Sequence, residues 1–78
     1  SIAWNGIDTF VAVGSGTNSI VWSTDALTWT AVTNSTSIFT SGTTVAWNGI
    51  KFIATGTGAN TIAYSTDGKN FNQIIHLV

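Results

Sequence analysis

The chain contains one sequence unit twice. The segment AWNGI at residues 3–7 recurs at residues 46–50, and FVAVGSGTNSIVWSTD at residues 10–25 matches FIATGTGANTIAYSTD at residues 52–67. Nine of the sixteen positions in the longer pair are identical, and the copies are spaced by 42 or 43 residues. Self-similarity at a fixed period of this size marks a repeat architecture. We therefore expect the chain to fold as two copies of one structural unit.

Each copy has the sequence pattern of four short strands. Apolar residues, many of them β-branched or aromatic, recur in short runs that Gly and Asn interrupt. The pairs Asn5-Gly6 and Asn48-Gly49 predict hairpin turns, because both residue types tolerate a positive φ. No apolar stretch has a helical period, so helix is not expected. The expected strands cover about 1–5, 9–14, 19–23 and 28–33 in the first copy, and about 44–48, 51–56, 61–65 and 70–76 in the second.

Both faces of the expected strands are apolar, with small residues such as Ala3 and Ala12 opposite large ones. A sheet with one solvated face would carry polar residues at alternate positions. A four-stranded antiparallel unit that is buried on both faces and repeats near 42 residues is typical of a β-propeller blade. Two blades cannot close a ring, because propellers have about 4–8 blades. We expect an all-β fold with blade 1 at residues 1–36 and blade 2 at residues 44–78, which completes a propeller ring by homo-oligomerisation.

The inter-blade connector is expected at residues 37–43. Its apolar residues are Ile38 and Phe39, and we expect one of them to enter the core as a plug. No equivalent of the connector follows blade 2, and the sequence does not begin with Met. An excised or engineered two-blade fragment is one interpretation of this pattern.

A second repeated motif, STDALTW at residues 23–29 and STDGKNF at residues 65–71, falls between the third and fourth expected strands. An Asp at this position accepts hydrogen bonds from backbone N–H groups of its own turn. The motif resembles the Asp-box, S-x-D-x-G-x-x-W, of sialidase-type (BNR-repeat) β-propellers. Each copy is one residue shorter than that pattern, and Ala26 replaces Gly in the first. The resemblance implies one structural turn in each copy. Its residues are Ser23, Asp25 and Trp29 in the first copy, and Ser65, Asp67, Gly68 and Phe71 in the second.

The resemblance implies a fold but carries over no catalytic residue. Sialidases bind their substrate with an arginine cluster and use Tyr, Glu and Asp for chemistry, whereas this chain has no Arg and no Glu. Glycoside hydrolysis requires two carboxyl groups beside one bond, and Asp8, Asp25 and Asp67 are expected in separate turns. His76 is the only histidine, and no G-x-S-x-G nucleophile elbow is present. We expect no enzyme activity and no catalytic, cofactor or metal site.

Composition restricts the partners of the chain. Two lysines without arginine cannot neutralise a run of phosphates, so nucleic acid is not expected. For the same reason an anionic membrane surface is not an expected partner, and no apolar run approaches the roughly 20 residues of a membrane helix. The primary expectation is a non-enzymatic module that assembles with three or four copies of itself.

The alternative is a lectin-like propeller that binds glycans in pockets between blades. Tryptophan rings can stack on sugars. In each repeat an Asn directly follows a Trp, at Trp4-Asn5 and at Trp47-Asn48. The competing interpretation is that these repeated aromatic residues fill the space between sheets. The possible ligand-binding residues are therefore Trp4, Asn5, Trp47 and Asn48.

Overall fold

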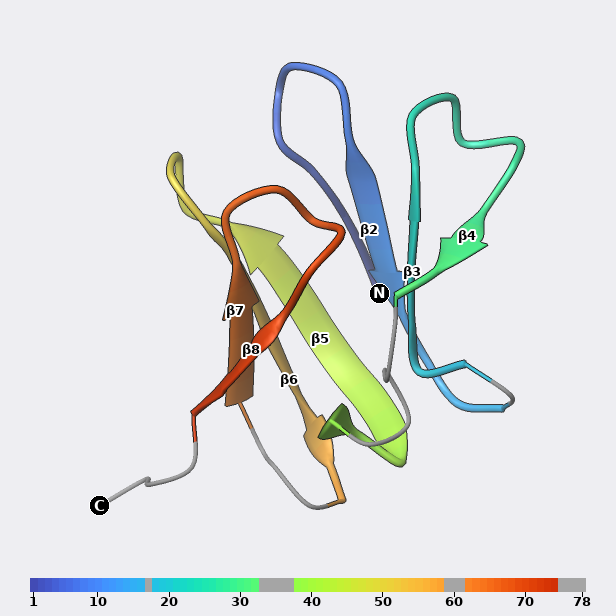
Figure 1. Ribbon diagram of the computed structural model, residues 1–78, viewed down its shortest axis with the longest axis vertical. Coiled ribbons are helices and arrows are strands. Elements are labelled where there is room, and N and C mark those ends of the chain that lie inside the picture. Colours follow the sequence, from blue (N-terminus) through green and yellow to red (C-terminus); the bar gives the residue numbers. More distant parts are fainter. Residues whose placement is uncertain (17, 33–37, 59–61, 75–78) are drawn as a thin grey trace.

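Two antiparallel β-sheets make up the computed structural model (Figure 1), which describes residues 1–16, 18–32, 38–58 and 62–74. Sheet A has the strand order β1-β2-β3-β4, and sheet B has the order β5-β6-β7-β8. The strands of sheet A are β1 (Ile2–Trp4), β2 (Phe10–Val13), β3 (Ile20–Ser23) and β4 (Thr30–Ala31). Those of sheet B are β5 (Ser41–Trp47), β6 (Phe52–Thr57), β7 (Ile62–Ser65) and β8 (Asn72–Ile74). The predicted all-β fold, with four antiparallel strands in each repeat, is confirmed.

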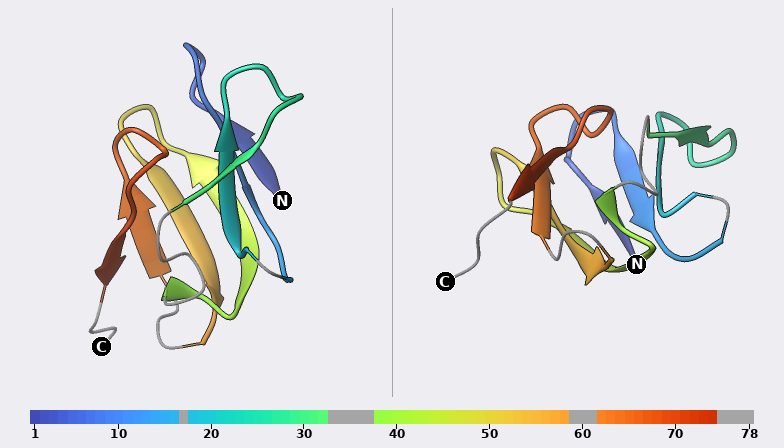
Figure 2. Two further views of the ribbon diagram at one scale, coloured as in Figure 1. Left: turned by 45° about the vertical axis from the view of Figure 1, so that its right-hand side comes forward. Right: turned by 60° about the horizontal axis from the view of Figure 1, so that its bottom comes forward.

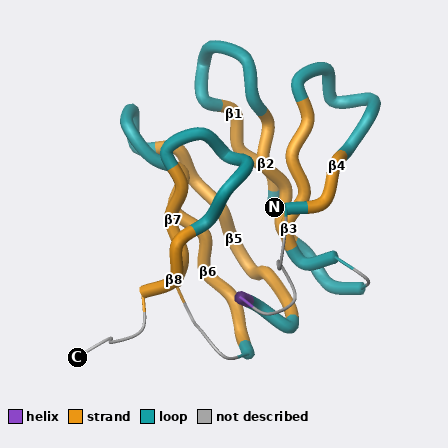
Figure 3. The backbone as a smooth tube through the Cα atoms, in the orientation of Figure 1, coloured by secondary structure: helices purple, strands orange, loops and turns teal. Residues whose placement is uncertain are grey.

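The strand register is the same in the two repeats. Phe10 pairs with Ser23 in sheet A, and the equivalent residues Phe52 and Ser65 pair in sheet B. The loops that follow β1, β3, β5 and β7 all lie at one end of the sheets (Figure 3). Both Asp-containing turns therefore lie at this same end of the two sheets, which we call one rim. No helix in the described part of the chain is long and apolar enough to cross a membrane.

Strand β5 and the two fourth strands differ in extent from the expected strands. Strand β5 begins at Ser41, within the expected connector at residues 37–43, because Ser41 pairs with Thr57 on β6. The backbone N–H of Gly42 also donates to the carbonyl of Gly14 over 2.8 Å, which ties the start of β5 to sheet A. The fourth strands are shorter than expected, and positions 33, 61, 75 and 76 of the expected strands lie outside the described residues.

The core lies between the two sheets, which are seen from two further directions in Figure 2. The side of sheet A that points toward sheet B, which we call its back face, contributes the fully buried Val11 and Ile20. The opposing side of sheet B, which we call its front face, contributes Phe52 and Ala54, both with no exposed surface. All four belong to one hydrophobic cluster, and strand β5 contacts both β1 and β2.

The two apolar residues of the predicted connector enter this core. Ile38 is 3% exposed and Phe39 is fully buried. The Phe39 ring lies so close to Gly56 that a methyl group there would be only 2.9 Å from it. The predicted plug is confirmed, with both residues rather than one in the core.

Candidate functional site

The Asp turn of sheet A is closed by its own side chains. Asp25 Oδ1 accepts hydrogen bonds from the backbone N–H groups of Leu27 (2.8 Å) and Thr28 (2.9 Å). The buried Ser23 hydroxyl donates to the same oxygen over 2.9 Å and accepts the N–H of Ala26, also over 2.9 Å. The turn therefore has the hydrogen bonding expected for a structural Asp.

The Asp turn of sheet B has the same geometry. Asp67 Oδ1 accepts the N–H groups of Lys69 (2.8 Å) and Asn70 (3.0 Å), and the Ser65 hydroxyl donates to it over 2.9 Å. Gly68 has a φ of +78°, as the turn requires, and its N–H donates to the Ser65 oxygen over 2.8 Å. Ala26 has a φ of +64° at the equivalent position of sheet A, where an L side chain is strained.

These hydrogen bonds keep the Asp side chains ionised. Desolvation raises the pKa of Asp67, but the N–H groups of Lys69 and Asn70 and the Ser65 hydroxyl outweigh it and lower the pKa to about 2. The N–H groups of Thr28 and Leu27 lower the pKa of the Asp25 carboxyl. A general acid at neutral pH needs a raised pKa, so these two carboxylates have the properties of turn anchors.

Asp8 lies in the loop after β1 and is held by its neighbours. The Asn5 amide donates to Asp8 Oδ1 over 3.1 Å, and the Thr9 hydroxyl donates to the same oxygen over 2.9 Å. These two bonds, with a smaller contribution from the charge of Lys69, lower the pKa of Asp8. Among the described residues, no three side chains of His, Asp, Glu or Cys lie close enough to hold a metal ion. His76 lies outside the described residues.

The Asn of the first Trp-Asn pair stabilises its hairpin loop. Asn5 Oδ1 accepts the backbone N–H groups of Ile7 (2.9 Å), Asp8 (2.9 Å) and Thr9 (3.0 Å). The positive φ of this loop, +81°, is at Gly6, and Asn5 does not share it. The prediction of a hairpin is confirmed, but Asn5 acts through its side chain and not through a left-handed backbone.

The second pair repeats this arrangement. Asn48 Oδ1 accepts the N–H groups of Ile50 (2.9 Å) and Lys51 (2.7 Å). Trp47 is half-buried and packs against the core, with its ring 4.8 Å from that of Phe52. The side-chain oxygens of Asn5 and Asn48 are therefore both engaged within their own loops.

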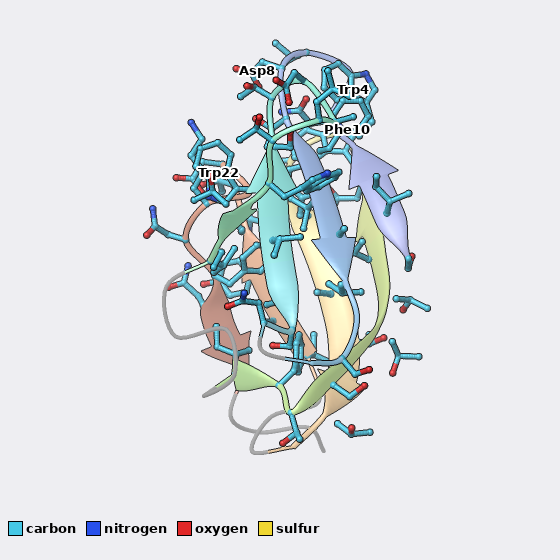
Figure 4. All side chains as sticks on the ribbon, turned by 90° about the vertical axis from the view of Figure 1, so that its right-hand side faces the viewer. Trp4, Asp8, Phe10 and Trp22 are labelled. Atoms are coloured by element: carbon cyan, nitrogen blue, oxygen red, sulfur yellow. The ribbon has the colours of Figure 1, made fainter. Side chains whose placement is uncertain are left out.

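Trp4 and Phe10 of sheet A are less buried than Trp47 and Phe52, their equivalents on sheet B. Trp4 is 41% exposed and stacks on Phe10, with ring centroids 4.4 Å apart. Trp29 lies 6.4 Å from the same Phe10 ring, whereas its equivalent Phe71 packs against the core. Figure 4 views the molecule from the side of sheet A and shows Trp4 beside Phe10 at one end.

The front face of sheet A is apolar and uncovered. In register across its four strands lie Ile2, Ala12, Val21 and Ala31. Ile2 is 56% exposed, whereas its equivalent on sheet B, Val45, is 7% exposed. An open pocket of about 180 Å³ indents this region and is lined by Ala12, Val13, Gly14, Asn18, Ser19 and Val21.

The back face of sheet B is also uncovered and is apolar in part, since Thr44, Thr55 and Asn72 lie on it as well. Ala46, Ile53 and Tyr64 lie in register across three strands; Ala46 is exposed, and the other two are half-buried. Lys51 covers part of the Tyr64 ring, with its Nζ atom 5.1 Å from the ring centroid. The equivalent face of sheet A contains the fully buried Val11. Each sheet therefore has one apolar face in the core and one outside it.

Sequence reasoning did not identify these two faces as different from the buried ones. The repeat predicts two-sided burial for both sheets, and the pattern is the same whether or not a neighbour is present. Leu27, 85% exposed at the tip of the first Asp turn, was also not singled out. The place of Leu27 in the repeat could have identified it. The equivalent residue of the second copy is Lys69, which lies over the ring of Trp22 on the other sheet.

Comparisons of this chain with family models, curated proteins and solved structures found no match.

Proposed function

We propose that this chain is a non-enzymatic β-sheet repeat module that assembles with copies of itself. The observation that carries the proposal is the uncovered front face of sheet A, whose equivalent on sheet B is buried in the core. Ile2 and Trp4 on this face are 56% and 41% exposed, whereas Val45, the equivalent of Ile2, is 7% exposed. Apolar faces of this kind mark sites of protein association.

The size and charge of the chain support association. A domain of this size buries only about 60% of the surface that its unfolded chain exposes, so added burial is a substantial gain. Five side chains carry fixed charge and the net charge is −1, so repulsion between copies is weak.

The proposed assembly is a β-propeller ring of Asp-box-like blades. The four-stranded sheets, the Asp turns on one rim and the contact of β5 with β1 and β2 support this arrangement. Three chains supply six blades and four chains supply eight, both within the usual range of about 4–8. Head-to-tail contacts close into a ring only if the rotation between neighbours divides a full turn.

The test is the solution mass of the 78-residue chain, measured by light scattering during size-exclusion chromatography. We expect three or four times the chain mass of 8.2 kDa. A single chain mass at every accessible concentration overturns the proposal, and a mass that grows without limit indicates an open filament instead of a ring.

A second candidate function is glycan binding, which the 41% exposure of Trp4 favours. An exposed indole face can stack on a sugar ring, and this function would compete with assembly, because Trp4 lies on the face that is proposed to associate. A glycan array probed with the unmodified chain and with Trp4→Ala tests it. Binding by the unmodified protein that Trp4→Ala abolishes supports the glycan function, and an array without hits removes it.

A further inference from the structure

We infer that the front face of sheet A in one copy packs on the back face of sheet B in the next copy. This contact repeats, between chains, the contact that joins the two sheets within each chain. The inference rests on the proposed self-assembly and specifies which two surfaces form the interface. It makes the association heterologous, so each copy uses two different faces.

The internal contact provides the template for the contact between chains. On the back face of sheet A, Val11 is fully buried, and a Cβ built on Gly68 of sheet B would lie 2.9 Å from its side chain. The residue equivalent to Val11 on sheet B is Ile53, which is of similar shape but only half-buried. The back face of sheet B thus retains part of the apolar surface that sheet A uses for packing, with Thr55 in place of the buried Val13, and no sheet lies over it.

The second half of the template is the tip of the Asp turn. Lys69 projects from sheet B over the Trp22 ring on the back face of sheet A, at 4.8 Å from its centroid. Leu27 occupies the equivalent position on sheet A, and it is 85% exposed. If the contact is repeated between chains, Leu27 lies over Tyr64 of the next copy, because Tyr64 is the equivalent of Trp22. This explains why an apolar residue is placed at the tip of an otherwise polar turn.

The front face of sheet A has the apolar character needed to pack on the back face of sheet B in the next copy. Its equivalent on sheet B, with Val45 and Phe52, is covered by sheet A within the chain. On sheet A the same positions are Ile2 and Phe10, and Ile2 is open to solvent. One free front face and one free back face per chain form a complementary pair, so a second copy of this chain is the occupant that both faces fit.

The hairpin tips provide matched controls. Ile7 and Ile50 occupy equivalent positions in the loops after β1 and β5 and are 78% and 72% exposed. Ile50 remains exposed although the front face of its sheet is covered, so this position lies outside the sheet-to-sheet contact. An aspartate at either position adds the same charge to the surface without entering the proposed interface.

The experiment compares Leu27→Asp on the front side with Ile53→Asp on the back side. We expect each variant alone to have the mass of one chain at concentrations where the unmodified protein is assembled. Mixed in equal amounts, they are expected to form a heterodimer, because one variant retains an intact front face and the other an intact back face. Ile7→Asp and Ile50→Asp are expected to assemble as the unmodified protein does.

The outcomes separate this inference from the proposed function. An unmodified chain that is monomeric overturns both. If the unmodified chain assembles and Ile53→Asp still self-associates, only the inference fails, because like faces then pair with each other. Circular dichroism checks the folding of each variant. If Ile53→Asp loses its sheet spectrum, Ala46→Glu replaces it, since Ala46 is exposed on the same face.

Discussion

The Nζ atom of Lys69 lies 4.8 Å from the centroid of the Trp22 ring, so a cation of one repeat covers an indole of the other. Lys69 belongs to the turn between β7 and β8, and Trp22 belongs to β3. A cation over an indole face contributes about 0.5–1 kcal/mol at an exposed site. The pair therefore adds a specific link to the apolar contact between the sheets.

Replacing Lys69 with Ala is expected to lower the free energy of unfolding by about 0.5–1 kcal/mol, the size of the lost cation–π contact. Because Trp22 loses its cover, its fluorescence is expected to move to longer wavelength. Urea unfolding followed by fluorescence measures both effects. Lys51→Ala is the control, since Lys51 lies over Tyr64 of its own sheet at 5.1 Å. Equal shifts in tryptophan emission for the two variants would contradict the proposed role of Lys69 at the sheet boundary.

Gly56→Ala is expected to destabilise the fold by about 1–3 kcal/mol, the usual range for overpacking. A methyl group at Gly56 would meet the carbonyl oxygen of Ser41 and, at 2.9 Å, the ring of the buried Phe39. Gly14 is the equivalent residue of sheet A, and a methyl group there meets nothing within 4 Å. Thermal unfolding of Gly56→Ala and Gly14→Ala in dilute solution compares the two positions. A loss of stability in Gly14→Ala as large as that in Gly56→Ala would show that the contacts with Ser41 and Phe39 are not the cause.

The strands and turns could be predicted because their signals are local. Short apolar runs and Asn-Gly pairs locate the hairpins, and the side-chain hydrogen bonds described for each Ser-x-Asp motif lie within its own turn. The plug was also predictable, since Ile38 and Phe39 are the only large apolar residues in a polar connector. The strand and turn signals depend on residues that are close in the sequence, and the plug follows from the composition of the connector.

The features that could not be predicted depend on contacts between distant residues. The start of β5 at Ser41 depends on pairing with Thr57 and on the carbonyl of Gly14. Val11 and Ile53 are similar side chains in the same pattern, and only the presence of a neighbouring sheet makes one buried and the other half-exposed. Which faces are uncovered, and therefore where the candidate interface lies, follows from the position of each sheet in the chain and not from the sequence of that sheet.

Gly68 and Ala26 occupy equivalent positions in the two Asp turns, and exchanging their residue types is expected to change the stability in opposite directions. Gly68→Ala adds a methyl group 2.9 Å from Val11 and 3.0 Å from Thr9 at a φ of +78°, so it is expected to cost at least about 1–3 kcal/mol. Ala26→Gly relieves a side chain from a φ of +64° and is expected to stabilise the chain by up to about 1 kcal/mol. Chemical unfolding of both variants measures whether each substitution raises or lowers the free energy of unfolding. A destabilising Ala26→Gly would mean that the conformational entropy which glycine adds to the unfolded chain outweighs the relief of strain.

The stability of the fold is expected to fall in acid because of Asp67. Its pKa is about 2 in the folded chain, below the ordinary value of 3.8. A lowered pKa in the folded state means that the unfolded chain binds the proton first, so the stabilising contribution is complete above pH 3.8 and is lost as the pH falls toward about 2. The midpoint of thermal unfolding, measured across this window, is expected to decrease steadily.

Asp67→Asn isolates the contribution of this carboxylate. The asparagine retains an oxygen that can accept the N–H groups of Lys69 and Asn70, but it has no proton to gain in acid. We expect a smaller loss of melting temperature between pH 3.8 and about 2 than in the unmodified chain. The remaining slope is expected from Asp25 and Asp8, whose pKa values are also lowered by hydrogen bonds in their own loops. An unchanged slope in Asp67→Asn would assign the acid sensitivity to those two residues alone.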